Sequence, residues 1–425
     1  MRHLLSSMVL MIAIPAAAQE FTTYKGHGGP VMGLTVAPDG QIASASFDNS
    51  VGLWSGSEPV WLEGHDAAVT AIATLPDGSV VSGGDDFAVL HWTPSGAVKI
   101  GAHRGKVTTL APSPDGAGVV SGSWDGDIIY WPLSDGAPKT LPYAGAGVNA
   151  VAYSADGTAL FAATSKGAIL RYDMATGDTP RPLVKGGFGI NRLTLGEAWL
   201  AYGAVDGGTR IIDAETGNQI ADFTLDRRPV LSMTYHAETA QLAVGDGEGF
   251  IMVIDTEQMR IARDFRAMRQ GPVWALAFSP DGTVIYAGGL DDVIYAWPVE
   301  LLDTYAPTEG DARTFLRSAD TMNNGERQFM RKCSICHSLD PGPSRRAGPT
   351  LHGLFGRSAG TLPNYRYSNT LDQSDIVWSD TTIDALFDEG PDNYIPGSKM
   401  PMQVIAGPQD RSDLIDFLRQ ATTEN

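Results

Sequence analysis

Two cysteines three residues apart, followed directly by a histidine, form the part of this 425-residue sequence best suited to chemistry. Cys333 and Cys336 are the only cysteines of the chain, and His337 completes a Cys-x-x-Cys-His motif. On one helical turn the two thiols can reach both vinyl groups of a haem, while the adjacent imidazole reaches the iron as proximal ligand. In an exported protein, this spacing predicts covalent attachment of one haem c.

The same three residues could serve two other kinds of site. A structural zinc site needs four ligands, whereas Cys333, Cys336 and His337 supply three and no further cysteine exists. A redox-active dithiol is possible, but the adjacent histidine and the pattern that follows it disfavour one. Haem attachment is therefore the preferred interpretation.

The first 18 residues predict export. MRHLLSSMVLMIAIPAAA has a basic start at Arg2, an apolar run from Leu4 to Ile14 and small residues at its end. This is the pattern of a signal peptide, with cleavage expected near Ala18/Gln19. The apolar run is too short to cross about 30 Å of hydrocarbon. We therefore expect a periplasmic protein with no membrane span after cleavage.

The charge balance excludes one class of partner. The chain has 49 Asp and Glu against 30 Lys and Arg, and its net charge is −19. Such acidity disfavours binding to nucleic acid. Residues 19–305 contain 33 acidic and 17 basic residues, whereas residues 306–425 contain 16 acidic and 12 basic residues. Five basic residues border the expected haem edge and suit acidic redox partners, although they could equally be ordinary solvated charges: Arg331, Lys332, Arg345, Arg346 and Lys399.

Residues 24–298 repeat one unit seven times. Each unit predicts four short strands with turns between them, and the clearest units begin with a Gly-His-like pair and end in Trp. The region 19–305 therefore resembles a WD-repeat seven-bladed β-propeller, which is all-β. The resemblance implies hydrogen bonds within the blades that join His27, His65 and His103 to Asp48, Asp86 and Asp125. We accordingly expect these histidines to be structural and not metal ligands.

Ring closure can also be predicted. The segment before the first repeat has the shape of the outer strand that precedes each later Gly-His pair. We expect Phe21–Tyr24 to form the outer strand of the seventh blade and to cover its open edge.

After a connector and the start of a first helix at 306–324, residues 325–425 resemble an all-α class I cytochrome c of the mitochondrial and bacterial kind. Gly325 and Phe329 match the first helix where it packs on the last. The resemblance makes His337 and Met400 the axial ligands of the haem iron, with the Pro349 carbonyl accepting the imidazole N–H. The further residues assigned to the haem environment are Arg357, Tyr367, Trp378 and Tyr394.

Two positions depart from the family pattern. Met402 lies two residues after Met400, so the sequence alone leaves a ligand exchange open. Leu371 stands where the family often has Asn near the haem.

A haem with both axial positions filled by protein is suited to electron transfer. The propeller sequence has no cluster of residues with metal-ligand spacing and no nucleophile motif. We therefore expect an electron carrier more than an enzyme, with the propeller docking a redox protein or a membrane electron-transfer complex. The alternatives are an oxidoreductase whose propeller binds a small substrate, and a redox-responsive scaffold.

Overall fold

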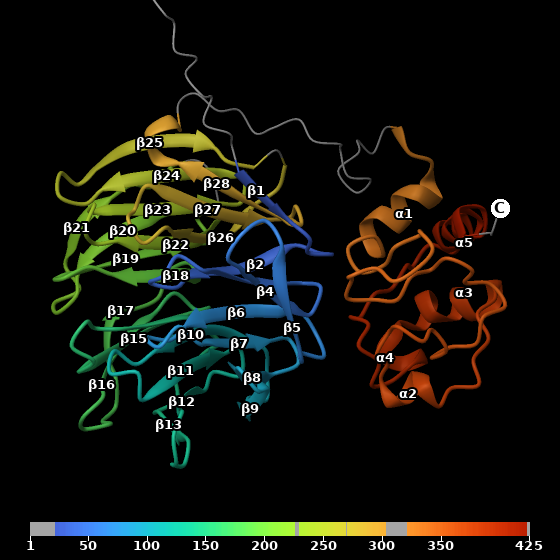
Figure 1. The fold of residues 1–425 in the computed structure, drawn as a ribbon, viewed down its shortest axis with the longest axis horizontal. Helices are drawn as coiled ribbons and strands as arrows, with labels where there is room; N and C mark the ends of the chain where they lie inside the picture. The colour runs from blue at the N-terminus through green and yellow to red at the C-terminus, as the bar shows by residue number, and fades with distance from the viewer. Residues whose placement is uncertain (1–21, 226–228, 269, 303–320, 423–425) are drawn as a thin grey trace, which may run out of the picture.

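Seven antiparallel sheets of four strands each surround a common centre, and a small helical domain lies beside this ring (Figure 1). The computed structural model describes residues 22–225, 229–268, 270–302 and 321–422. The expected signal peptide and most of the connector lie outside these residues. The described residues confirm the predicted fold class: an all-β seven-bladed propeller followed by an all-α domain.

The first four blades follow the repeat units in order. Blade 1 contains β2 (Val31–Val36), β3 (Ile42–Ser46), β4 (Ser50–Trp54) and β5 (Pro59–Glu63). Blade 2 contains β6 (Val69–Thr74), β7 (Val80–Gly84), β8 (Ala88–Thr93) and β9 (Gly96–Ala102). Blade 3 contains β10 (Val107–Pro112), β11 (Gly118–Ser123), β12 (Ile128–Pro132) and β13 (Lys139–Thr140). Blade 4 contains β14 (Val148–Tyr153), β15 (Ala159–Thr164), β16 (Ile169–Asp173) and β17 (Arg181–Val184).

The last three blades complete the ring. Blade 5 contains β18 (Ile190–Leu195), β19 (Trp199–Ala204), β20 (Thr209–Asp213) and β21 (Gln219–Asp222). Blade 6 contains β22 (Val230–His236), β23 (Gln241–Asp246), β24 (Phe250–Asp255) and β25 (Arg260–Arg266). Blade 7 contains β26 (Val273–Phe278), β27 (Val284–Gly289), β28 (Val293–Pro298) and β1 (Thr22–Lys25).

The blades are held together by side chains from adjacent sheets. Val51 of blade 1 and Val69 of blade 2, for example, are fully buried in one apolar cluster. The first strand of every blade also carries a β-bulge after its first residue, as between Val69 and Ala71. At this bulge the Thr70 hydroxyl donates to the Val107 carbonyl of the next blade at 2.6 Å. Such bonds give a partner to backbone groups that the bulge leaves without their regular hydrogen bonds between strands.

Hydrogen bonds within the first three blades follow the expected pairing of histidine and aspartate. In blade 1 the His27 Nδ1 lies 3.0 Å from the Asp48 carboxylate, and its Nε2 lies 2.7 Å from the Ser44 hydroxyl. The Trp54 indole N–H donates to the same Ser44 oxygen at 2.8 Å. Blades 2 and 3 repeat this arrangement, with sets made of His65, Ser82, Asp86 and Trp92 and of His103, Ser121, Asp125 and Trp131. These polar groups satisfy one another inside the blades, which is a structural role.

The buried histidines predict that acid destabilises the propeller. Burial lowers the pKa of His103, and it also lowers that of His91, below the ordinary value of 6.5. The unfolded chain then binds protons near pH 6.5 that the folded chain does not, so the free energy of unfolding falls as the pH drops from 7 to 5. The slope is at most about 1.4 kcal/mol per pH unit for each histidine.

Circular dichroism melts of the propeller at pH 7, 6 and 5 measure this effect. Asp125 does not titrate in this range. Burial raises its pKa, but hydrogen bonds from the backbone N–H groups of Asp127 and Arg104 outweigh burial and hold the pKa below 3.8. The variant His103→Asn is expected to be less stable at pH 7 but to lose less stability on acidification. A melting temperature independent of pH over this range would contradict the assignment of a neutral buried His103.

The strand before the first repeat closes the ring, as predicted. Strand β1 pairs antiparallel with β28, and Thr22 lies opposite Ala296 while Lys25 lies opposite Val293. The Tyr24 ring also packs edge-on against Trp54 of blade 1, with ring centroids 5.7 Å apart. Phe21, the first residue of the predicted strand, lies outside the described residues. Closure thus joins residues near the start of the chain to the last blade.

Deleting residues 19–24 should destabilise the propeller by about 2–4 kcal/mol, because the outer hydrogen bonds of β28 lose their partners. The measurement is the midpoint of thermal unfolding followed by circular dichroism. Deletion of residues 19–21 alone leaves Thr22–Lys25 in place and serves as the control. Equal midpoints for the two deletions would contradict a stabilising role for the closing strand.

The C-terminal domain is built from short helices around one apolar cluster. The elements after β28 are the 3-10 helix η1 (Val299–Leu301) and the helices α1 (Asn324–Lys332), α2 (Asn369–Asp372), α3 (Asp380–Glu389), α4 (Pro391–Tyr394) and α5 (Pro408–Thr422). Helices α1 and α5 cross closely at Gly325, where an added Cβ would lie 2.0 Å from the Asp413 carbonyl oxygen. The Phe329 and Phe417 rings pack in a tilted arrangement beside this crossing, with ring centroids 5.5 Å apart. The predicted contact between the first and last helices is therefore present.

Among the described residues, none of the helices has the length and apolar character needed to cross a membrane.

Candidate functional site

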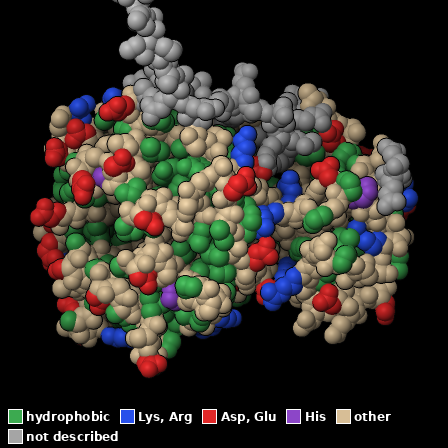
Figure 2. Space-filling model, viewed as in Figure 1, with side chains coloured by type: hydrophobic (Ala, Val, Ile, Leu, Met, Phe, Trp, Pro, Cys, Tyr) green, Lys and Arg blue, Asp and Glu red, His purple; other side chains and the backbone are tan. Residues whose placement is uncertain are grey.

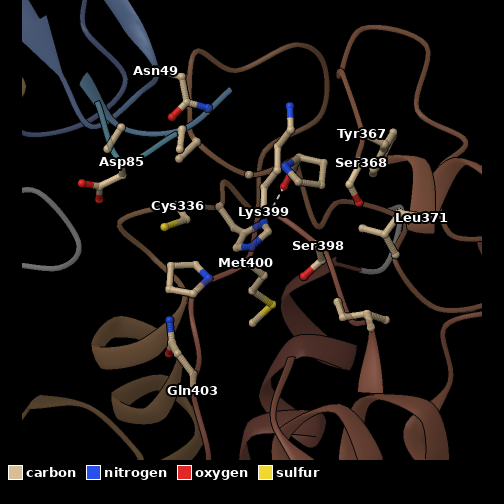
Figure 3. A pocket seen from close by; sticks show the side chains of 18 of the residues that line it. Asn49, Asp85, Cys336, Tyr367, Ser368, Leu371, Ser398, Lys399, Met400 and Gln403 are labelled. Atoms are coloured by element: carbon tan, nitrogen blue, oxygen red, sulfur yellow. Dashed lines mark hydrogen bonds between the residues drawn. The ribbon is translucent and has the colours of Figure 1, made fainter. Parts of the chain in front are cut away.

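A cavity of about 830 Å³ lies inside the C-terminal domain and reaches the propeller (Figure 3). Its volume falls in the range of roughly 300–1,000 Å³ found for ligand and cofactor sites. The residues of the C-terminal domain that line it include most of those singled out from the sequence: Cys333, Cys336, His337, Pro349, Arg357, Tyr367, Leu371, Trp378 and Met400. Side chains 67 residues apart in the sequence thus meet at one cavity.

The Cys-x-x-Cys-His motif follows the end of helix α1 directly. The helix ends at Lys332, and the backbone N–H groups of Cys336 and His337 both donate to the Cys333 carbonyl, at 3.0 and 2.9 Å. This tight turn places both thiols and the imidazole along the cavity wall. Burial raises the pKa of Cys333 to about 12 and that of Cys336 to about 11. Thiols of this kind are poor nucleophiles, which disfavours the redox dithiol.

His337 is oriented by a hydrogen bond that leaves one ring nitrogen available. Its Nδ1 lies 2.7 Å from the Pro349 carbonyl oxygen, as the resemblance implied. Burial lowers the pKa of His337, so the ring is neutral, and Nδ1 must carry the proton to donate to a carbonyl. The Nε2 lone pair is then free to bind a metal ion, and the carbonyl fixes the ring orientation.

The described residues contain no group of three or more His, Cys, Asp or Glu side chains able to hold a metal ion between them. Of the two alternatives to haem attachment, the redox dithiol is weakened by the raised pKa of the two thiols.

The two candidate methionines differ in their surroundings. Met400 lines the cavity and packs against the apolar cluster of the domain, and Figure 3 shows its thioether there. Met402 is 50% exposed and lies against Gly390, outside the cavity lining. This geometry favours Met400 as the ligand. Met322 and Met330 are buried in the apolar cluster, in keeping with packing roles.

The remaining predicted residues divide into two groups. Arg357, Tyr367 and Trp378 line the cavity, whereas Tyr394 is half-buried at the end of α4 and is not part of the lining. Arg357 donates to the carbonyls of His352 and Thr350, at 2.7 and 2.9 Å, which folds the loop after the motif around its guanidinium. Burial lowers the pKa of Arg357 but leaves the group positive at neutral pH.

Polar atoms in the cavity wall fit a group with both apolar and anionic parts. The Ser368 hydroxyl and the Gln403 side-chain oxygen are buried and have no hydrogen-bond partner in the described part of the chain, and both residues line the cavity. At Gly348 an added Cβ would lie 2.4 Å from the His337 ring, so only glycine allows the loop to approach it. Together with Leu371, Trp378 and the Arg357 guanidinium, these features suit a flat apolar ring system that carries carboxylates, such as haem.

Tyr365 belongs to the stretch Tyr365-Arg366-Tyr367 that the resemblance places around the haem, and it lines the cavity. Its hydroxyl donates to the Ala347 carbonyl at 2.5 Å and steadies the loop before Gly348. Sequence reasoning did not predict that the propeller supplies part of the wall, through residues that include Asn49, Asp85 and Trp124. The exposed indole of Trp124, under the Lys106 ammonium at 3.5 Å, is the one signal that could have marked this surface.

Comparison with known proteins gives a different family for each of the two domains. The family described as Cytochrome c matches residues 322–422, and the WD domain, G-beta repeat matches 18–55, 57–93, 97–132 and 263–298. Cytochrome c of Sesamum indicum is 42% identical over 102 residues, which are 24% of this chain and 90% of that protein. Cytochrome c of Cochliobolus lunatus is 43% identical over 99 residues, 23% of this chain and 90% of that protein. Cytochrome c of Arabidopsis thaliana is 43% identical over 98 residues, which are 23% of this chain and 87% of that protein.

Proposed function

We propose that this chain, which belongs to the cytochrome c family through its C-terminal domain and carries a WD-repeat propeller before it, is a periplasmic electron carrier. The cytochrome c domain binds one covalently attached haem c, and its function is electron transfer. We further propose that His337 and Met400 ligate the haem iron, that the protein is periplasmic, and that the propeller docks a redox partner. The observation that carries the proposal is the single cavity at which Cys336, His337 and Met400 meet.

When bound, the haem supplies a metal centre that accepts and releases one electron with little rearrangement. The residues of the chain hold and tune it. Cys333 and Cys336 anchor it, and the Pro349 carbonyl keeps His337 in the tautomer whose Nε2 can ligate. Met400 offers a thioether, which favours the reduced state more than a second histidine would. The apolar side chains of Leu371 and Trp378 keep water away from the bound haem, and the positive Arg357 guanidinium neutralises charge on the haem carboxylates.

The periplasmic location rests on the sequence pattern of residues 1–18, since covalent haem attachment and a cleaved signal peptide are consistent with one another. The proposed partner is a redox protein or a membrane electron-transfer complex. The support for an acidic partner surface is the basic character of Lys332 and Lys399, which line the cavity.

Expression in a bacterium that matures c-type cytochromes tests the proposal. The periplasmic fraction should contain the protein with one haem per chain by the pyridine haemochrome assay, and it should accept one electron in a redox titration. The haem-loaded chain then serves as bait in periplasmic and membrane extracts, with residues 321–425 alone as the control bait. A redox protein retained only by the full chain supports the docking role. Zero or two haems per chain, or steady turnover of small substrates with an artificial mediator, would contradict the carrier assignment.

A further inference from the structure

The C-terminal domain touches the propeller through its basic residues, and among the described residues the ion pairs across the junction all have the same polarity. Arg345 pairs with Glu63 at 2.9 Å, and Lys399 and Arg366 both pair with Asp66, at 3.2 and 3.3 Å. Basic and acidic side chains accordingly gather along this junction in Figure 2. The cytochrome supplies the cations and the propeller the anions, which matches the charge division found in the sequence.

The contact also includes close packing around Arg345. Its guanidinium lies over the Trp61 ring, 4.2 Å from the ring centroid. Its backbone carbonyl approaches Gly28 so closely that an added Cβ there would lie 0.9 Å from the oxygen. The backbone N–H of Gly28 donates to the blade 1 aspartate, Asp48. Asp66 and Arg104 occupy the equivalent positions of blades 2 and 3, and their backbone N–H groups donate in the same way to the aspartates of those blades. The blade therefore tolerates a side chain here, and it is the docked cytochrome that requires glycine.

The propeller residues at this junction face the haem cavity. In Figure 3, Asn49 and Asp85 come from propeller turns, between β3 and β4 and between β7 and β8, while Cys336 and Met400 come from the cytochrome. The side-chain oxygens Oδ1 of Asn49 and of Asp85 are buried there and have no hydrogen-bond partner among the residues that the structure describes. The propeller thus forms the outer wall of a cavity whose inner wall holds the predicted iron ligands.

We infer that the propeller surface formed by Gly28, Trp61, Glu63 and Asp66 is the docking surface for the haem-bearing face of the chain's own cytochrome domain, and that docking covers the edge through which electrons pass. This inference rests on the proposed function, because it concerns access to the same haem. Arg345, Arg366 and Lys399 cannot contact the propeller and an acidic redox partner at once. A partner must therefore compete with the propeller for them. Exposed ion pairs are weak and screened by salt, so the docked state opens reversibly.

The test uses the haem-loaded full chain and two variants that disturb docking differently. Gly28→Arg introduces the residue type that blade 3 has at this position and places its side chain against Arg345. Asp66→Lys reverses the charge that faces Arg366 and Lys399. Gly56→Ala and Asp135→Lys are the matched controls, since Gly56 has no neighbouring atoms within 4 Å of an added Cβ and Asp135 is exposed on the β12–β13 hairpin. Small-angle scattering gives the radius of gyration, and stopped-flow mixing with ascorbate gives the rate of haem reduction.

At 10 mM salt we expect both docking variants to be more extended than the unmodified chain and to be reduced at least three-fold faster. High salt should raise the radius of gyration and the reduction rate of the unmodified chain toward those of the docking variants. The controls should give the same values as the unmodified chain at each salt concentration. Unchanged scattering and rates in both variants would overturn the inference, as would a scattering mass that doubles with concentration, which would assign the docked cytochrome to a second copy. Absence of reducible haem in every protein would instead contradict the proposed function.

Discussion

The variant in which Cys333 and Cys336 are both serine will contain no covalently attached haem. The two sulfurs are the only thiols of the chain, and the turn after α1 presents both to the cavity. Serine keeps the size of the side chain but forms no thioether bond, so the fraction of the haem that acidified acetone extracts should rise from about none to nearly all of the total. The pyridine haemochrome of the unextracted protein reports the same change.

The control for this variant is Ile335→Val, which alters the centre of the motif and leaves both sulfurs in place. It is expected to retain one covalent haem per chain. A double serine variant that still carries haem through denaturing electrophoresis would show that another residue forms the bond. The cytochrome domain of the double variant should also unfold at a lower temperature than the loaded protein, since a ligand bound only to the folded state stabilises it.

The sequence predicted the propeller well because its repeats are local signals. Each predicted unit end, such as Trp54 or Trp297, falls in the third strand of its blade, and the histidine of each clear unit meets the predicted aspartate. The serine that joins histidine to tryptophan was not anticipated, because a serine in a Ser-Gly-rich strand carries no distinctive signal. The bulges of the inner strands were not anticipated either, since they depend on the packing of neighbouring blades around a ring.

The haem site was predictable to a similar degree, but its outer wall was not. His337 and Pro349 are 12 residues apart within one recognisable pattern, and their hydrogen bond was expected. Asp66 and Lys399 are 333 residues apart, and their contact depends on how two separately folded domains meet. The charge division of the chain indicated that they could attract one another. It could not indicate which blades would be used, because acidic residues occur throughout the propeller.

Replacing Met400 by alanine should abolish the sulfur-to-iron charge-transfer band of the oxidised protein and lower its reduction potential. The thioether is the softer and less basic of the two predicted axial donors, so its loss removes the ligand that favours the reduced state. The expected result is a complete loss of the band, with covalent haem still at one per chain because both cysteines remain. Absorption spectroscopy and a redox titration of the purified full chain measure the two effects.

Met402→Ala is the matched control, because it removes the same side chain two residues away, where that side chain is half exposed and outside the cavity lining. It should retain the band and change the potential little. The opposite pair of results, a band that survives in Met400→Ala and disappears in Met402→Ala, would assign the ligand to Met402. That exchange would require the loop after α4 to shift so that Met402 enters the cavity, since Met402 now lies against Gly390 and outside the lining. Loss of the band in both variants would instead mean that Met402 positions Met400 through the loop, a role that Met402→Leu should rescue by restoring the bulk.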